Sequence, residues 1–525
     1  MTFVFRNNTI ERFMPAEYEF SGYDDISVVP DEATDFVWWY QVPIRFDIDS
    51  LVAEVETYIS KLNLILPSIG NRQLIIISLA DFLSVSIETS DDRLMHAINE
   101  YNDTIYHFAK EHSNIRIIDI SSFYNKYSAA ELIDWKLYFL SQTPINPKLA
   151  TAFKEWYSLQ LKAISLQRKK CIVLDLDNTL WGGVLGEDGL NQIAISGSYP
   201  GKAYNLWQQG LRQLKQKGVL LCICSKNNIE DVEEVWNKRA DMVLKQNDFA
   251  AVRINWQDKV TNISELAKEL NIGLDSMVFI DDNPTEIELV RQLLPMVEVP
   301  DFPLQPYDLP KLYKQLVEKY FQTYNITAED KQKTEQYRLN ALRNEAASHY
   351  SDMTEYLRSL EMQLTIEPIN EQTLPRAAQL TQKTNQFNLT TKRYAEADLR
   401  SLINNGAYGW TLDVADKFGD YGITGLIIVN AEGMIDTMLM SCRVLGKGVE
   451  NAFIRIVLYL LRKKGFQTIT GQYIKTSKNS QTANFYPNNG FELIEHNGDN
   501  NAVYSIRLSD ADLSVNDYLK INVDQ

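Results

Sequence analysis

Two pairs of aspartates stand at the ends of apolar runs that are typical of buried strands. Asp175 and Asp177 end the run CIVLDLD, and Asp281 and Asp282 end the run SMVFIDD. Because side chains alternate along a strand, one carboxylate at such an end points at a ligand and the next emerges on the turn beyond it. Oxygen-rich groups of this kind select Mg²⁺, and a carboxylate can attack phosphorus. The pattern indicates a magnesium site with nucleophilic chemistry.

A hydroxyl and a cation add to this set. Ser225 ends the apolar run VLLCICS, and Lys259 stands at the start of a predicted helix. A carboxylate nucleophile that faces a phosphate dianion needs such groups to offset the repulsion. Helix capping after a strand would explain one pair of acids by itself, but it does not explain all of these positions together.

The elements that must position these residues alternate along the chain. Buried parallel strands are predicted at 171–177, 219–225, 242–244 and 276–282. Helices are predicted between them, at 202–217, 229–238, 258–271 and 284–294. This alternation is typical of a doubly wound sheet, in which ligands bind at the carboxyl ends of the strands.

The motifs DLDNT, the serine of CSKN, Lys259 and FIDDNP resemble, in order and spacing, the four motifs of the haloacid-dehalogenase superfamily of phosphotransferases. The resemblance implies that Asp175 attacks phosphorus, and that Asp177 protonates the leaving oxygen and then activates water. It also implies that Ser225 and Lys259 hold the phosphoryl oxygens. The implied metal ligands are Asp175, the backbone carbonyl of Asp177 and Asp281, with Asp282 close by.

The gaps between these motifs are short. Ser225 follows Asp177 by 48 positions, and Lys259 follows Ser225 by 34. Neither gap holds a cap domain, so a neighbouring domain or a macromolecular substrate would exclude water. The Gly-rich segment 179–189 is a candidate flap. The whole stretch LDLDNTLWGGVLGEDG resembles a narrower group, the FkbH-like proteins (subfamily IIIC), as do 255–263 and 278–291.

A glycine-rich segment, SCRVLGKGVENAF, precedes a predicted helix at 451–465. Arg443, Gly446 and Gly448 form R-x-x-G-x-G, in which glycines permit close backbone approach and helix amides receive phosphate. A simple turn at the helix start is the alternative. With the downstream segment at 477–495, the pattern resembles the GNAT acetyltransferases. This implies an α+β domain whose loop holds the pyrophosphate of coenzyme A, or here the phosphopantetheine arm of a carrier protein.

Other C-terminal segments also resemble the FkbH-like group, namely 381–394 and 416–425. By its chemistry alone, the first is equally well explained as a solvated loop. Position alone favours Cys442 as a small buried strand residue, since free cysteines are often buried. The resemblance implies instead that Cys442 is catalytic and carries an acyl group.

The first part of the chain is predicted to be a small α/β domain, with strands at 74–82 and 114–120. In the FkbH-like group this domain is similar to the SGNH-hydrolase fold, which needs a D-x-x-H motif. The corresponding tetrapeptide, Asp134 to Leu137, has no histidine. The domain is therefore predicted to be non-hydrolytic, as a docking or lid element. The sequence WWY at 38–40 is interpreted as core rather than as a partner contact.

Length, charge and composition limit the class of protein, its location and its division into domains. The chain has 525 residues and a net charge of −17, which argues against a nonspecific nucleic-acid binder. No apolar run is long enough for a transmembrane helix, and four scattered cysteines favour a cytoplasmic location. The predicted parts are an SGNH-like domain at 1–165, a capless HAD-like domain at 166–300, a linker with helices at 301–360 and a GNAT-like domain at 361–525.

The resemblance to FkbH-like proteins implies a bifunctional, Mg²⁺-dependent enzyme of polyketide biosynthesis. It would take a three-carbon glyceryl group from 1,3-bisphosphoglycerate, remove the phosphates and load the acyl group on an acyl carrier protein. The alternative is a Mg²⁺-dependent phosphatase fused to a CoA-dependent N-acetyltransferase. A third hypothesis is a non-enzymatic scaffold, against which the intact motifs of the middle domain count.

Overall fold

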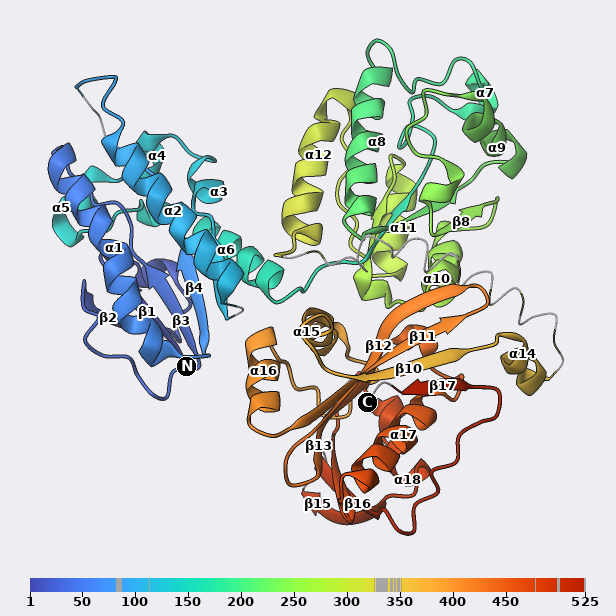
Figure 1. Ribbon diagram of the computed structural model, residues 1–525. Coiled ribbons are helices and arrows are strands. Elements are labelled where there is room, and N and C mark those ends of the chain that lie inside the picture. The colour runs from blue at the N-terminus through green and yellow to red at the C-terminus, as the bar shows by residue number, and fades with distance from the viewer. Residues whose placement is uncertain are drawn as a thin grey trace. The chain divides into compact units, whose positions relative to one another are not determined.

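The computed structural model of the protein describes residues 1–81, 87–112, 114–324, 326, 339, 343, 346, 350, 352–476, 478–497 and 501–523, apart from the side chains of 442, 496 and 497. The chain forms two compact units, Met1–Ile164 with Tyr394–Ser401, and Ser165–Arg393 with Leu402–Gln525. Three separate sheets lie within them (Figure 1). The predicted multidomain α/β class is confirmed, whereas the exact domain boundaries stay predictions.

The first sheet is parallel, with the strand order β2-β1-β3-β4-β5. Trp38 and Tyr40 pack on one face with side chains of two long helices, and Trp39 packs on the other face. All three aromatic side chains are fully buried, which agrees with their interpretation as core. The strands are β1 (Thr2–Arg6), β2 (Glu19–Tyr23), β3 (Asp35–Trp39), β4 (Gln73–Ile77) and β5 (Ile115–Ile118). The helices are α1 (Ile48–Ile69), α2 (Arg93–Glu111), α3 (Ser121–Tyr124), α4 (Ala129–Leu132), α5 (Trp135–Ser141) and α6 (Ala150–Ile164).

The second sheet is also parallel, with the order β8-β7-β6-β9, and helices separate its strands along the chain. Apolar side chains from both of its faces are buried in two clusters. The strands are β6 (Cys171–Leu174), β7 (Leu220–Ser225), β8 (Ala251–Ile254) and β9 (Met277–Ile280). The helices are α7 (Leu185–Asp188), α8 (Gly201–Gln216), α9 (Ile229–Lys238), α10 (Lys259–Glu269), α11 (Pro284–Leu293) and α12 (Leu309–Leu316), and a π-helical turn follows at Val317–Phe321.

The strand predicted at 242–244 is wrong. Met242 and Leu244 are buried, but the backbone there turns instead of pairing with the sheet. The amides of Val243 and Leu244 donate to Oε1 of Gln208, at 3.0 and 3.2 Å. A side chain thus satisfies the backbone groups that a neighbouring strand would otherwise satisfy. The fourth strand of the sheet is β8, which the sequence analysis did not predict.

The third sheet is mixed and has eight strands in the order β15-β16-β14-β13-β12-β11-β10-β17. The long helix α17 packs its apolar side chains against it. The strands are β10 (Gln363–Pro368), β11 (Tyr408–Asp416), β12 (Gly419–Val429), β13 (Met434–Met440), β14 (Thr468–Ile474), β15 (Glu492–Asn497), β16 (Asn501–Arg507) and β17 (Lys520–Val523). The helices are α14 (Met353–Ser359), α15 (Leu374–Lys383), α16 (Glu396–Asn404), α17 (Val449–Lys463) and α18 (Phe485–Asn488).

A short segment, Phe387–Leu389, bridges two strands of this sheet, and we call it the strap. The parallel strands β13 and β14 pair with each other at two positions near their amino-terminal ends. Further along, the amide of Leu389 donates to the carbonyl of Met438 at 3.0 Å. On the other side, the amide of Ile474 donates to the carbonyl of Leu389 at 2.8 Å. The strap therefore continues the sheet where β13 and β14 no longer pair.

None of the helices in the described part of the chain is long and apolar enough to cross a membrane.

Candidate active site

The predicted residues of the magnesium site gather at the carboxyl edge of the second sheet. The register places Leu174 opposite both Ile223 and Ile280, so β6, β7 and β9 end side by side. Asp175 directly follows β6, and its amide donates to the carbonyl of Ile280 at 3.0 Å, which extends the ladder by one residue. Parallel pairing thus brings together residues that are about a hundred positions apart in the chain.

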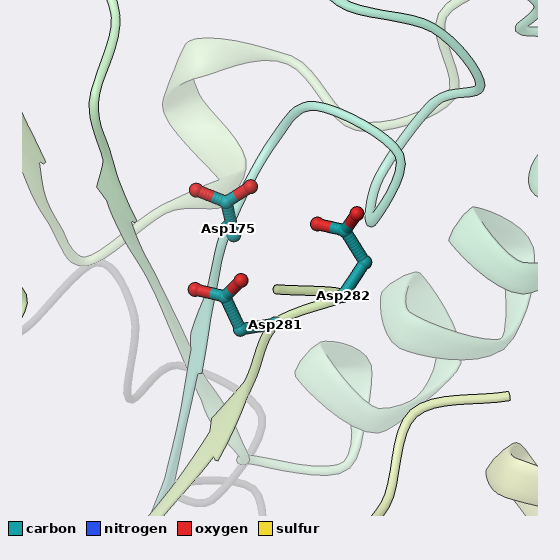
Figure 2. Close-up of side chains that lie close together, drawn as sticks. All are labelled: Asp175, Asp281 and Asp282. Atoms are coloured by element: carbon teal, nitrogen blue, oxygen red, sulfur yellow. The ribbon is translucent and has the colours of Figure 1, made fainter. Parts of the chain in front are cut away.

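Three carboxylates at this edge form a group that could hold a metal ion. One oxygen from each of Asp175, Asp281 and Asp282 lies within 4.8 Å of the others, and the three side chains converge in Figure 2. Asp175 and Asp281 are buried, and Asp282 is less so. Hard oxygen donors of this kind fit Mg²⁺. The donor set therefore suits the predicted metal, with Asp282 as a third carboxylate rather than only a neighbour.

Lys259 joins two of these carboxylates. Its Nζ lies 2.7 Å from Oδ1 of Asp175 and 2.5 Å from Oδ2 of Asp281, and its side chain is almost fully buried. Burial alone would lower the pKa of Lys259, but the two carboxylates outweigh it and hold that pKa above its ordinary value. Lys259 is therefore charged at neutral pH and offsets part of the negative charge of the site.

Burial dominates the electrostatics of Asp175. It raises the pKa of Asp175 to about 7, against the opposing effect of Lys259, and the charge of Asp281 adds to the rise. A hydrogen bond from Ser225 works in the other direction, so the hydroxyl lies close to this carboxylate. Burial and the charge of Asp281 also raise the pKa of Asp282. The acids repel one another, and a divalent cation would relieve that repulsion.

The carboxylate of Asp177 lies outside the group of three and has its own partners. Its Oδ1 accepts from the indole Nε1 of Trp181 and from the amide of Leu185, both at 3.0 Å. Its Oδ2 accepts from Nδ2 of Asn227 at 2.9 Å. The side chain thus lies outside the group of three carboxylates, and its role in proton transfer stays a prediction.

Two functional contacts were missed by the sequence analysis. Asn227, two positions after Ser225, was not singled out, although the segment CSKNN contains its amide side chain. Thr179 is fully buried, and its hydroxyl accepts from the amide of Asp282 at 3.1 Å. The DLDNT motif contains this threonine, so its spacing from Asp175 is a signal that could have located it.

The Gly-rich segment 179–189 is anchored rather than free. Leu180, Trp181 and Leu185 are buried in the core of the second sheet. Gly183 has a φ of +98°, and a Cβ there would lie 2.6 Å from Oδ2 of Asp188. The turn therefore requires glycine at this position. In this structure the segment predicted as a flap packs in the core and donates two hydrogen bonds to Asp177.

At the rim of the site, Lys226 pairs with Glu286 at 2.6 Å. Trp256 lies in the loop before α10, is 71% exposed and donates from Nε1 to Oδ1 of Asn228 at 3.1 Å. Along the chain, Lys226 directly follows Ser225 and Trp256 comes three positions before Lys259; neither was among the predicted site residues.

The proposed phosphate loop of the C-terminal sheet leads into α17. Gly446 and Gly448 both have a φ of +76°, and Gly448 is the residue that precedes the helix. Arg443 lies in a 3₁₀ turn at Cys442–Val444, and its Nε donates to the hydroxyl of Ser441 at 3.2 Å. The side chain of Cys442 lies outside the described part of the structure. A Cβ at Gly446 would meet nothing within 4 Å, so there is room beside the loop.

Charged groups surround this loop. Glu450 on the first turn of α17 is largely buried, which raises its pKa, while the amide of Gly446 bonds to it and lowers the pKa. An anionic ligand at the loop would compete with this carboxylate for the amide. Lys447 donates from Nζ to the hydroxyl of Tyr421 at 2.5 Å, and burial followed by the charge of Arg343 lowers the pKa of Lys447 to about 8.

Behind Lys447 lies a buried ion pair. Arg343 donates from Nε and Nη2 to the two oxygens of Asp416, each at 2.7 Å, and the hydroxyl of Tyr421 donates to Asp416 at 2.9 Å. The segment 416–425 is therefore built around Asp416. In the segment 381–394, Asn388 and Thr390 are buried, so that segment is not merely a solvated loop.

In the first domain, Asp134 is an N-cap rather than part of a triad. Its Oδ1 accepts from the amide of Leu137 at 3.0 Å at the start of α5. His96 and His107 lie on α2 and pair with its N-cap Asp92 and with Glu111 on the helix, and His112 follows its end. That this domain is non-hydrolytic stays a prediction.

Comparisons with known proteins show a shared fold. No family model and no curated protein sequence matches the chain. Among solved structures, the chain resembles the N-terminal part of the protein BF1531 from Bacteroides fragilis, which contains a phosphatase domain complexed with Mg. The TM-score is 0.52 and the identity 24%, over 62% of this chain and 94% of that one. Over the matched part, this chain thus shares the fold of that protein.

Weaker likenesses cover 28% of the chain. The ribosomal-protein-S18-alanine N-acetyltransferase from Escherichia coli matches at 14% identity over 96% of its own length, with a TM-score of 0.23. A spermidine N-acetyltransferase from Vibrio cholerae matches at 17% identity over 94% of its length, with a TM-score of 0.22.

Proposed function

We propose that the protein is a Mg²⁺-dependent phosphohydrolase joined to an acyl-transfer domain. The observation that carries the first half is the convergence of Asp175, Asp281 and Asp282 around a buried lysine at the carboxyl edge of a parallel sheet. A buried nucleophilic carboxylate with a fixed cation and a metal-ligating set is what an attack on a phosphate ester requires.

The residues supply the steps in order. An oxygen of Asp175 attacks phosphorus while Lys259 and Ser225 hold the phosphoryl oxygens. Asp177 gives its proton to the departing oxygen, which leaves an aspartyl phosphate. Asp177 then takes a proton from the water that attacks this phosphate, and Asp175 is restored. The bound Mg²⁺ would supply positive charge to offset the repulsion between carboxylate and phosphate.

This half is tested by phosphate release from simple monoesters. Purified protein with Mg²⁺ should release phosphate from alkyl and aryl phosphates, and EDTA should stop the release. The variant Asp281→Asn should lose both metal binding and activity. Equal phosphate release with and without a divalent cation would overturn the assignment.

For the second half, we propose that the C-terminal domain is a GNAT-like acyltransferase that binds a phosphopantetheine arm. The glycines of the α17 loop, with left-handed backbone and open space beside Gly446, support this. The proposed partner is an acyl carrier protein, and the proposed acyl donor is 1,3-bisphosphoglycerate, which carries both an acyl phosphate and a phosphate ester. One chain with two chemistries would process both groups.

Two incubations separate this proposal from its alternative. A carrier protein with its pantetheine arm, 1,3-bisphosphoglycerate and the enzyme should give a glyceryl mass gain on the carrier and free phosphate. Acetyl-CoA with a panel of amines should give no acetylated product. Acetylation of an amine without loading of the carrier would favour the phosphatase–N-acetyltransferase alternative, and neither product would support a scaffold.

A further inference from the structure

The two oxygens of Asp177 are not equivalent. Oδ1 accepts two hydrogen bonds, from Trp181 and from the amide of Leu185. Oδ2 accepts one, from Asn227. Two N–H donors fill the lone-pair positions of Oδ1, so a proton on this carboxyl group resides on Oδ2. The oxygen that exchanges protons with the substrate is therefore the one beside Asn227.

Asn227 also contacts the phosphate-binding serine. Its Nδ2 lies 2.9 Å from Oδ2 of Asp177 and 3.3 Å from Oγ of Ser225. The residue is 6% exposed. It stands between the last residue of β7 and the N-cap of α9, Asn228, so strand and helix hold its backbone on both sides. One amide group thus spans the distance between the phosphoryl position and the acid.

We propose that Asn227 is a positioning residue that holds Oδ2 of Asp177 beside the phosphoryl group seated on Ser225. This rests on the proposed phosphohydrolase function and deepens it. As the oxygen of Asp175 bonds to phosphorus, the bond from phosphorus to the ester oxygen breaks, and the proton on Oδ2 moves to that oxygen. In the second step Oδ2 takes a proton from water, whose oxygen bonds to phosphorus as Asp175 leaves.

The consequence is a dependence on the leaving group. An alkoxide needs a proton as it departs, whereas p-nitrophenolate leaves without one. General acid catalysis contributes about 10²- to 10⁴-fold. Loss of Asn227 should therefore lower kcat/KM for glycerol phosphate by about 10²-fold and for p-nitrophenyl phosphate by less than about 5-fold. A purely structural role would lower both values to the same extent.

The chain offers a matched control. Asn228 is the next residue and has the same side chain, but it bonds to Asp231 and Trp256 rather than to Asp177. We expect Asn228→Ala to leave both substrates near wild-type rates. Asn227→Leu keeps the branching of asparagine at Cγ, in a larger side chain without the donor, and serves if Asn227→Ala does not fold. Thermal melting with Mg²⁺ verifies that each variant keeps its metal site.

The outcomes are distinct. A selective loss with glycerol phosphate in Asn227→Ala or Asn227→Leu supports the proposal. Equal losses with both substrates, or wild-type rates in both variants, overturn it. A wild-type protein that hydrolyses neither ester contradicts the proposed phosphohydrolase function itself. The wild-type activity is therefore measured before any variant is compared.

Discussion

Replacement of Asp175 by asparagine should abolish catalysis and at the same time stabilise the metal-free protein. Burial raises the pKa of Asp175 from an ordinary 3.8 to about 7. At about 1.36 kcal/mol per unit, the folded state disfavours the ionised carboxyl group by about 4 kcal/mol. The amide side chain of the Asp175→Asn variant carries no charge, so this cost disappears, and Lys259 keeps Asp281 as its partner.

The sign of the pH dependence follows from the raised pKa. Between an unfolded value near 3.8 and a folded value near 7, the folded state holds a proton that the unfolded state has lost. The free energy of unfolding of the wild type therefore falls as the pH rises through this window. The advantage of Asp175→Asn should be largest at pH 8 and smaller by about 2 to 3 kcal/mol at pH 5.

The assay is thermal melting in EDTA at both pH values. The relevant transition is the one that added Mg²⁺ shifts in the wild type, because other domains melt separately. At about 2–4 °C per kcal/mol, Asp175→Asn should raise this transition by several degrees at pH 8. With Mg²⁺ the order should reverse, since the wild type binds the cation more tightly.

Activity gives the second readout. Removal of a nucleophile from covalent catalysis should lower phosphate release by at least about 10³-fold. A metal-free Asp175→Asn protein that melts below the wild type at pH 8, or one that releases phosphate at the wild-type rate, would refute the reasoning. Glu286→Gln, which removes a carboxylate that pairs with Lys226 and is not one of the metal group, is the control for the loss of a single carboxylate.

Two further outcomes are expected in the C-terminal domain. Incubation with 1,3-bisphosphoglycerate should place an acyl adduct on Cys442, which peptide mass spectrometry would detect. The variant Cys442→Ala should abolish loading of the carrier protein. An adduct on another residue would favour direct attack by the pantetheine thiol. Burial and the charge of Arg343 lower the pKa of Lys447 to about 8, so its rate of acylation by a trace reagent should reach half its maximum near pH 8. Lys463 on the surface of α17 is the internal control. A half-maximal rate for Lys447 above pH 10 would contradict this prediction.

The residues of the metal group were predictable because local pattern and chemistry agree there. Asp175 and Asp281 each follow an apolar run that is typical of a buried strand, and parallel strands place their carboxyl ends together. The contacts of Asp177 were not predictable. They depend on a side-chain amide, Asn227, whose position follows from the pairing of β6 with β7 and not from spacing along the chain.

The wrong strand at 242–244 has a similar cause. Its apolar pattern records burial, and burial does not distinguish a strand from a packed turn when a distant side chain satisfies the amides. Gln208 lies on α8, far away in sequence, and the residues around Val243 give no sign of its hydrogen bond to that side chain. The role of the segment 381–394 was open for the same reason, because a polar composition does not reveal that Asn388 is buried.

The strap makes one junction of the large sheet different from all the others. The strands β13 and β14 pair directly at Met434 and Ile435, near one end. Beyond that point they are joined only through the hydrogen bonds of the strap. Asn479 holds the strap in place, since its Nδ2 donates to the carbonyl of Asn388 at 2.9 Å. Detachment of the strap would expose the amides of Leu389 and Ile474 to hydrogen exchange together. Such an opening would leave the direct pairing of β13 with β14 at Met434 and Ile435 intact.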